Sequence, residues 1–144
     1  MPTTEELVTV LGGSVVLRQR VRSLYDLDRL VQKGLPYQAL EQVMKRFGLE
    51  LVEAQKLLLM PPRTFARRKE MVRIRPGESD RLIRLARVGT HAAKVLGTDE
   101  KAATWLHRPN RALNNRLPLE LLQTDLGTKQ VEEILNRIEH GILG

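Results

Sequence analysis

The stretch PGESDRLIRLARVGTHAAKVLG, residues 76–97, decides the fold of this chain. Its apolar and small residues recur at intervals of three and four, which places them on one face of a helix. Proline is favoured in the first turn of a helix and glycine just past its end, so Pro76 and Gly97 mark the two ends. We therefore predict one long helix that faces the core through Leu82, Leu85, Ala86, Gly89, Ala92, Ala93 and Leu96.

Shorter helices are expected on the C-terminal side of this segment. Thr98 is a good N-cap for a helix through Trp105-Leu106, and Pro109-Asn110 predicts a turn. Pro118 then opens a second short helix. The last helix ends at Gly141 and carries an i, i+3, i+4, i+7 stripe of Val131, Ile134, Leu135 and Ile138.

On the N-terminal side the pattern also predicts short helices. A helix over 4–11 begins at an N-cap, Thr3 or Thr4, and ends at Gly12-Gly13, whereas the β-branched stretch 14–17 is expected to be extended. Two further helices, from Leu24 and from Pro36, are expected to end at Gly34 and Gly48. Their expected buried faces are Leu24, Leu27, Leu30 and Val31 in the first, and Ala39, Leu40, Val43, Met44 and Phe47 in the second. Brief helices over 51–58 and 62–71 follow, separated by Leu59-Met60-Pro61.

Composition agrees with an all-α fold. Of the 144 residues, 42% are hydrophobic and only 3% aromatic, so the core is built from aliphatic side chains, which suit packed helices. The formal net charge is +7, and the excess lies almost wholly in the first half. Residues 1–76 hold 14 basic and 8 acidic side chains, whereas residues 77–144 hold 10 and 9. A localised excess of this kind indicates a polyanionic partner.

The basic side chains concentrate on the short segment 61–75, which follows a short predicted helix and a tight turn. Such a segment is typical of the recognition helix of a helix-turn-helix, where cations bond guanine edges or neutralise phosphates. The plainer interpretation is a solvated cationic helix face. We favour DNA binding, with Arg63, Thr64, Arg67 and Arg68 on the groove and Lys69, Arg73 and Arg75 on phosphates. The expected parts are an N-terminal extension (1–23), a helix-turn-helix module (24–76) and a C-terminal helical module (77–144).

Several function classes lack the residues they need. There is no cysteine, and the three histidines lack the spacing of metal ligands, so we expect no metal site, no cofactor and no catalytic residues. No phosphate-binding loop or nucleophile elbow is present, which leaves an enzyme without a motif. The apolar runs are too short to span a bilayer, so we expect no membrane contact and a soluble, cytoplasmic protein.

The closing segment carries two large apolar side chains, Ile142 and Leu143, just past a helix stop. Side chains of this kind need a surface to bury against. Docking on their own domain and insertion into a partner's groove are both open on this pattern.

At this point the residues suggest a family. The chain closely resembles the Xre-type antitoxins of RES–Xre toxin–antitoxin systems from about Leu27 onward, and its C-terminal half resembles the Xre/MbcA/ParS toxin-binding domain. The resemblance rests on Arg63-Thr64-Phe65-Ala66-Arg67-Arg68, Glu78-Ser79-Asp80-Arg81-Leu82, Leu85-Ala86-Arg87, Trp105-Leu106, Pro109-Asn110, Leu117-Pro118-Leu119-Glu120-Leu121-Leu122, Thr124-Asp125-Leu126-Gly127, Val131 and Arg137-Ile138-Glu139-His140-Gly141.

The resemblance implies a partner and a mode of action. It implies that the C-terminal module binds a NAD-attacking toxin of ADP-ribosyltransferase-like fold and blocks its active site. It also implies that the helix-turn-helix represses the operon, that the toxin complex alters this DNA binding, and that dimers hold two toxins. One position departs from the family's pattern, because relatives often have glycine at the helix-turn-helix turn where this chain has Leu59.

From this resemblance we predict the residues that contact the toxin. Polar side chains in the turn 110–116 and in the tail 137–144 cannot all be consumed by the core. The expected set is Asn110, Asn114, Asn115, Arg116, Arg137, His140, Gly141, Ile142, Leu143 and Gly144. The alternative is a stand-alone helix-turn-helix transcription regulator whose C-terminal half dimerises or senses a ligand.

Overall fold

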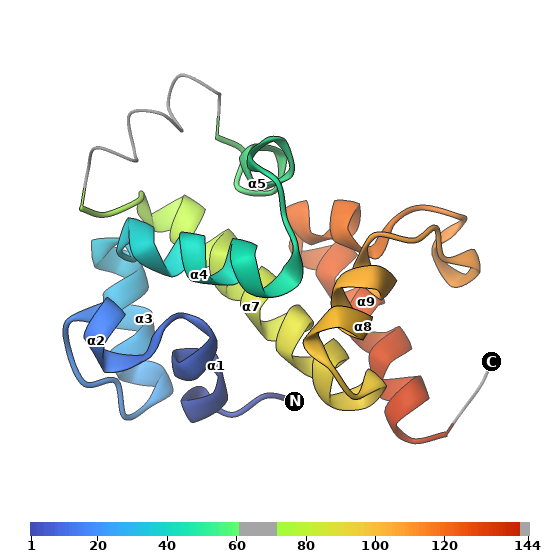
Figure 1. The fold of residues 1–144 in the computed structure, drawn as a ribbon, viewed down its shortest axis with the longest axis horizontal. Coiled ribbons are helices and arrows are strands. Elements are labelled where there is room, and N and C mark those ends of the chain that lie inside the picture. Colours follow the sequence, from blue (N-terminus) through green and yellow to red (C-terminus); the bar gives the residue numbers. More distant parts are fainter. Residues whose placement is uncertain (61–71, 142–144) are drawn as a thin grey trace.

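The structure, a computed structural model, describes residues 1–60 and 72–141. Within these ranges the chain is all-helical, as predicted, and extended pairing is limited to two isolated bridges. The helices in Figure 1 are α1 (Thr4–Val10), α2 (Gly13–Leu17), α3 (Leu24–Lys33), α4 (Tyr37–Phe47), α5 (Leu51–Leu57), α7 (Pro76–Leu96), α8 (Asp99–Leu106) and α9 (Asp125–Glu139), with two 3-10 helices, η1 (Arg111–Leu113) and η2 (Pro118–Gln123).

The long helix α7 crosses the middle of the molecule, and the other helices pack around it (Figure 1). Its first turn carries Pro76 and its C-cap is Gly97, at a positive φ of 111°, so both sequence signals mark the observed ends. It contacts α1, α3 and α4 from the first half of the chain and α8, α9 and η2 from the second half. This single helix therefore joins the two halves of the chain.

The close approach of α4 to α7 depends on Gly89. A Cβ built at this position would lie 2.6 Å from two carbons of the Phe47 ring. Phe47 is fully buried. The absence of a side chain at position 89 is what lets the ring lie against α7.

The first 23 residues are part of the core. The N-cap of α1 is Thr3, whose hydroxyl accepts from the Glu6 N–H while the Glu6 carboxylate accepts from the Thr3 N–H. The prediction of an extended stretch over 14–17 was wrong, because Gly12 at φ 112° reverses the chain and starts α2. Four apolar side chains of this region are buried, those of Leu7, Val10, Leu11 and Leu17.

Helix α3 buries Leu27 and Leu30 as predicted, but the prediction for Leu24 was wrong. Leu24, the first residue of the helix, is 68% exposed. After α3 the chain pairs with the segment before α7, where the Ile74 N–H donates to the Leu35 carbonyl at 2.8 Å. The Leu35 N–H in turn donates to the buried Ser79 hydroxyl of α7, also at 2.8 Å.

In the C-terminal half the predicted caps are present. Thr98 caps α8, and the segment from Pro118 is helical, although it is the 3-10 helix η2. Helix α9 lies along α7 and is held there by Arg87, whose Nε donates to a Glu132 carboxylate oxygen at 2.8 Å. Buried residues of both halves form one hydrophobic cluster. The division into modules at residues 23 and 76 therefore stays a prediction.

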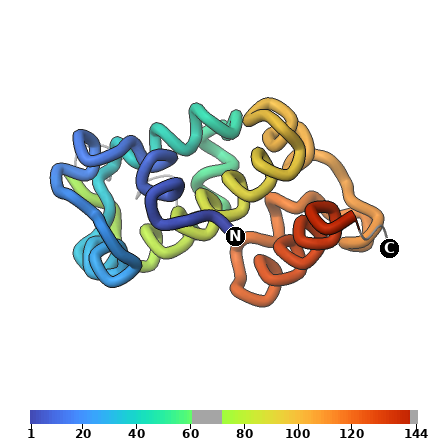
Figure 2. Tube along the Cα trace, turned by 90° about the horizontal axis from the view of Figure 1, so that it is seen from below, coloured from blue at the N-terminus to red at the C-terminus, as the bar shows by residue number. Residues whose placement is uncertain are grey.

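Figure 2 shows how the molecule is extended along its long axis. Helices α2 and α3 lie at one end, and α9 lies at the other. The loop that contains η1 also lies at the α9 end in both views (Figures 1 and 2). The two ends are bridged by α7.

Candidate functional site

The elements that flank positions 61–71 lie on one side of the molecule. Helix α5 precedes this segment and the first turn of α7 follows it, and both face the upper side in Figure 1. Two of the predicted DNA contacts are described there: Arg75 is exposed, whereas Arg73 is half-buried. The other predicted DNA contacts, Arg63, Thr64, Arg67, Arg68 and Lys69, and the expected helix over 62–71, lie outside the described residues.

Arg73 has a role in the fold itself. Its Nη1 donates to the Gly34 carbonyl at 2.8 Å, and its backbone pairs with Pro36 in an isolated bridge. This guanidinium therefore holds the connection between α3 and α4 against the chain that enters α7.

The turn after α5 has left-handed backbone at Leu59, with φ of 54°. The Leu59 N–H donates to the Lys56 carbonyl at 3.2 Å, which closes the turn. Leucine adopts this conformation only at a cost in free energy, which explains why glycine suits the position. The turn is therefore built with left-handed geometry even though its side chain is leucine.

The loop over 110–116 is closed by its own backbone. The Asn110 N–H donates to the Arg116 carbonyl at 3.0 Å, and the Asn115 N–H donates to the Asn110 carbonyl at 2.9 Å. The Asn110 side chain accepts from the Ala112 N–H at 2.9 Å, so its amide oxygen is used inside the loop. Buried Leu113 anchors the loop to the core.

Asn114 and Asn115 both have left-handed backbone, with φ of 57° and 64°. Asparagine is among the few residues with a side chain that adopt this conformation readily, so the pair Asn-Asn is the signal for such a turn. The side chains of Asn114, Asn115 and Arg116 are exposed. The loop therefore presents three polar side chains on a fixed backbone.

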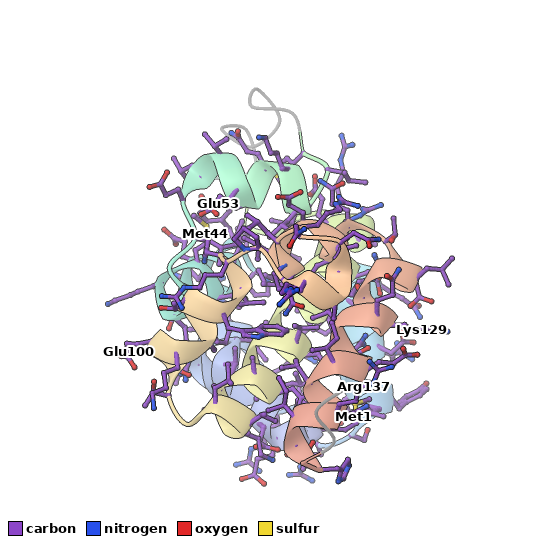
Figure 3. The ribbon with its side chains drawn as sticks, turned by 90° about the vertical axis from the view of Figure 1, so that its right-hand side faces the viewer. Met1, Met44, Glu53, Glu100, Lys129 and Arg137 are labelled. Carbon is purple, nitrogen blue, oxygen red and sulfur yellow. The ribbon has the colours of Figure 1, made fainter. Side chains whose placement is uncertain are left out.

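The end of α9 presents a second group of predicted contacts. Arg137, His140 and Gly141 are exposed, and Figure 3 shows Arg137 with Lys129 along the outer side of α9. Glu139 lies back against α7, where its Oε1 is 2.8 Å from Nε2 of buried His91. The hydrogen bond from His91 holds the pKa of the Glu139 carboxyl below its ordinary value. The predicted contacts Ile142, Leu143 and Gly144 lie outside the described residues.

The loop lies at the upper right and the last turn of α9 at the lower right in Figure 1, so both belong to the half of the molecule away from α2 and α3. Helix α9 also packs against η1 within the loop. The half-buried Trp105 packs against the core. No group of three metal-ligating side chains occurs among residues 1–60 and 72–141.

Comparison with known sequences finds a matching family for each half of the chain. Residues 26–87 match the family described as the antitoxin Xre-like helix-turn-helix domain, and residues 91–141 match the antitoxin Xre/MbcA/ParS C-terminal toxin-binding domain. A protein of Pseudomonas putida named Antitoxin Xre is 32% identical over 134 residues, which cover 86% of this chain and 83% of that protein. The chain belongs to the Xre antitoxin family. Two further relatives have the same name. The one from Yersinia enterocolitica is 30% identical over 78% of this chain and 77% of its own length. The one from Photorhabdus laumondii is 29% identical over 81% of this chain and 80% of its own length.

Membership in the family confirms the predicted family and its two kinds of domain. The antitoxin combines an Xre-like helix-turn-helix domain with a toxin-binding domain, and the family is not enzymatic. The loop over 110–116 and the end of α9 both lie within the matched toxin-binding domain. In the part of the antitoxin that the structure describes, no helix is long and apolar enough to cross a bilayer.

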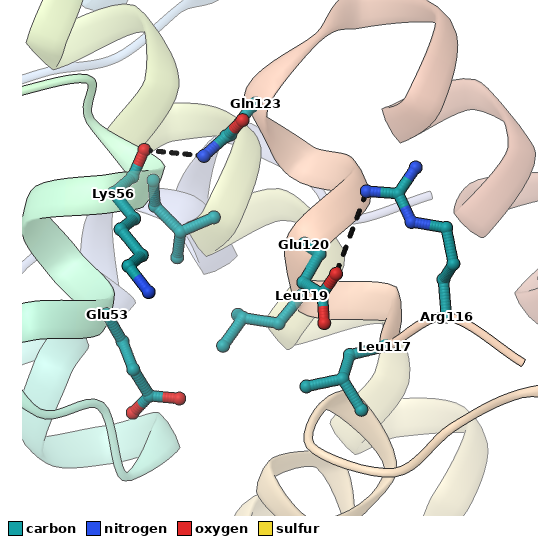
Figure 4. A pocket seen from close by; sticks show the side chains of 8 residues that line it. Glu53, Lys56, Arg116, Leu117, Leu119, Glu120 and Gln123 are labelled. Carbon is teal, nitrogen blue, oxygen red and sulfur yellow. Dashed lines mark hydrogen bonds and ion pairs between the residues drawn. The ribbon is translucent and has the colours of Figure 1, made fainter.

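The antitoxin also has a groove where its two domains meet, which the sequence did not reveal. It has a volume of about 360 Å³ and lies between α5 and the segment 116–123 (Figure 4). Its charged lining comes from both domains, and Arg116 lies 3.7 Å from Glu120 across an exposed ion pair. The lining residues are Glu53, Lys56, Leu57, Arg116, Leu117, Leu119, Glu120 and Gln123.

Proposed function

We propose that this antitoxin neutralises a RES-type, NAD-consuming toxin by covering its active site, and that it represses its own operon by binding operator DNA. The observation that supports the first part is the pairing of a fixed polar loop, 110–116, with the exposed end of α9 inside a toxin-binding domain. Because the loop backbone is already ordered, little conformational entropy is lost when a partner binds it. The fold then acts by steric occlusion.

The C-terminal tail is the part to remove first. An antitoxin that ends at His140 is expected to bind the toxin but to leave its NAD consumption largely intact. The measurement is the rate of NAD loss by purified toxin titrated with full-length or shortened antitoxin. Complete inhibition by the shortened chain at equal concentrations would rule out occlusion by the tail.

A point substitution on α9 tests the surface more finely. Arg137→Ala is expected to weaken toxin binding by about 1 kcal/mol or more, as truncation of a well-placed interface arginine does. Lys129→Ala is the matched control, since Lys129 is an exposed cation on the same helix (Figure 3). Toxin affinities are measured by calorimetry. Equal affinities of both variants and the unmodified antitoxin would show that Arg137 does not lie in the toxin interface.

For the DNA interface we propose the basic segment that carries Arg67 and Arg68. The double substitution to alanine is expected to abolish specific operator binding. In a plot of the logarithm of the binding constant against the logarithm of salt concentration, the slope is expected to become shallower by about 0.9 for each phosphate that is no longer neutralised. The double substitution of Lys101 and Arg108, exposed cations of the toxin-binding domain, is the control. Unchanged operator affinity in a gel-shift titration of the Arg67/Arg68 variant would remove this assignment.

A homodimer on a palindromic operator completes the proposal. One helix-turn-helix buries a small surface on DNA, so two-fold pairing is needed for tight binding. Operator binding also places the antitoxin in the cytoplasm. Co-expression with the product of the adjacent gene, followed by a pull-down, tests the toxin partner, and failure to capture a RES-type protein would favour a stand-alone transcription regulator.

A further inference from the structure

Helix α5 of the helix-turn-helix domain is supported by the toxin-binding domain. Of the described elements, η2 is the one against which α5 packs most extensively. Buried Leu57 of α5 and buried Leu119 of η2 both line the groove between them (Figure 4). The position of α5 therefore depends on a segment more than 60 residues away, within the matched toxin-binding domain.

The C-terminal end of α5 is bound by Gln123. The carbonyls of the last helical turn accept no hydrogen bond from N–H groups of the helix itself, so they need donors from elsewhere. The Lys56 carbonyl receives two, the Leu59 N–H of the turn at 3.2 Å and the Gln123 side-chain amide at 2.8 Å (Figure 4). The Gln123 carbonyl accepts from Nη1 of Arg84 on α7 at 3.2 Å. Gln123 thus ties the turn of the helix-turn-helix to the central helix.

The N-terminal end of α5 is also contacted by the toxin-binding domain. Glu53 accepts from the Glu50 N–H through Oε1 at 2.9 Å, and its Oε2 lies 2.7 Å from Nε2 of His107. Nδ1 of His107 lies 2.7 Å from the Ala103 carbonyl, which can only accept, so Nδ1 carries a proton. Nε2 meets the geometry of no hydrogen bond in the described structure, so its contact with Glu53 is favourable only as an ion pair, with both ring nitrogens of His107 protonated.

We propose that Gln123 and His107, side chains of the toxin-binding domain, are positioning residues for operator binding. They fix the two ends of α5, and with them the turn that leads into the predicted DNA-reading segment. The inference rests on the proposed DNA binding. Arg116, a predicted toxin contact, lines the same groove as Glu53 and Lys56, so a toxin that binds Arg116 lies next to the helix these residues hold.

The test compares one chemical change at two places in the full-length antitoxin. Gln123→Met removes the amide donor without changing charge. Gln130→Met makes the same change on α9, where the amide donates within its own helix, to the Leu126 carbonyl. Operator affinity is measured by fluorescence anisotropy at a temperature where all variants are folded by circular dichroism. Gln123→Met is expected to weaken operator binding at least tenfold and non-specific DNA binding far less, because phosphate contacts persist while their register is disturbed.

His107→Leu, which removes both ring nitrogens, is the second variant and is expected to weaken operator binding in the same selective way. Operator affinities of both variants within twofold of the unmodified antitoxin would overturn the proposal. An equal loss of affinity for operator and non-specific DNA would also overturn it, since it indicates general destabilisation. If the unmodified antitoxin does not bind its promoter DNA, the proposed DNA binding fails instead, so the two failures are distinct.

Discussion

At the scale of single residues, the contact between Gly89 and Phe47 sets how closely two helices approach. Gly89→Ala places a methyl group 2.6 Å from the ring, and overpacking of this kind costs about 1–3 kcal/mol. The better helix propensity of alanine offsets up to about 1 kcal/mol of this cost. We therefore expect the free energy of unfolding, measured with urea, to fall by about 1–2 kcal/mol.

Gly77→Ala is the matched control for this prediction. Gly77 lies in the first turn of the same helix, and the nearest atom to its added Cβ is the flexible Arg81 Nη1 at 3.4 Å. We expect this variant to be as stable as the unmodified chain or slightly more stable. Equal stability of the two alanine variants would show that the Phe47 ring moves aside without cost.

The left-handed residue Leu59 leads to a prediction of opposite sign. The left-handed backbone at Leu59 costs a non-glycine residue about 1–2 kcal/mol of folding free energy. Glycine avoids this cost, but it gives the unfolded chain more conformational entropy, which lowers stability by about 0.4–1 kcal/mol. Since the Leu59 side chain is 53% exposed, its removal gives up little packing, and Leu59→Gly is expected to stabilise the fold by up to about 1 kcal/mol. Val52→Gly, at an exposed position inside α5, is expected to destabilise it by up to about 0.5 kcal/mol. Thermal unfolding of both variants decides the point, and destabilisation by both would contradict it.

At the scale of elements, the contact of α9 with α7 makes a pH-dependent contribution. The hydrogen bond from His91 lowers the pKa of Glu139 from its ordinary value of 4.5. Because the pKa is lower in the folded chain than in the unfolded one, the stabilisation is present above pH 4.5 and is lost as the pH falls through the lowered pKa. A carbon-13 NMR titration of the Glu139 carboxyl is expected to give a midpoint below 4.5, and one closer to 4.5 in His91→Leu. Identical midpoints in two folded proteins would refute the role of His91.

Elements with strong periodicity and clear caps were predictable, whereas short ones were not. Helix α7 has a long apolar stripe between Pro76 and Gly97, so local signals agree with the packing. Helix α2 has five residues, two of them valine, and it forms because the reversal at Gly12 and the burial of Leu17 outweigh weak helix propensity. Leu24 was misplaced because a stripe does not show which of its terminal residues has a neighbour.

The same limit applies to the candidate site. The exposed polar loop over 110–116 follows from its composition, and its Asn-Asn pair indicates left-handed backbone. The supporting contacts do not follow, because Gln123 and Lys56 are 67 residues apart in the chain and no local pattern joins them. Likewise the hydrogen bond of Arg73 to Gly34 spans 39 residues, and a basic residue in a basic segment gives no sign of it.

At the scale of the whole molecule, the first 23 residues complete the core. Leu11 is fully buried, and its replacement by alanine is expected to cost about 2–5 kcal/mol. Val15, four residues later, is 88% exposed, and Val15→Ala is expected to change stability by less than about 0.5 kcal/mol. Urea unfolding of both variants tests this, and a small effect of Leu11→Ala would make these residues a dispensable extension after all.

The central position of α7 has a consequence for how such antitoxins diversify. Recombination that joins the DNA-binding half of one antitoxin to the toxin-binding half of another has to cut this helix, since the two family matches meet between residues 87 and 91. Around that junction Gly89 must suit a ring from α4, while Arg87 and His91 must suit carboxylates on α9. We therefore expect a hybrid protein joined within α7 to fold stably only when both parents share these partners.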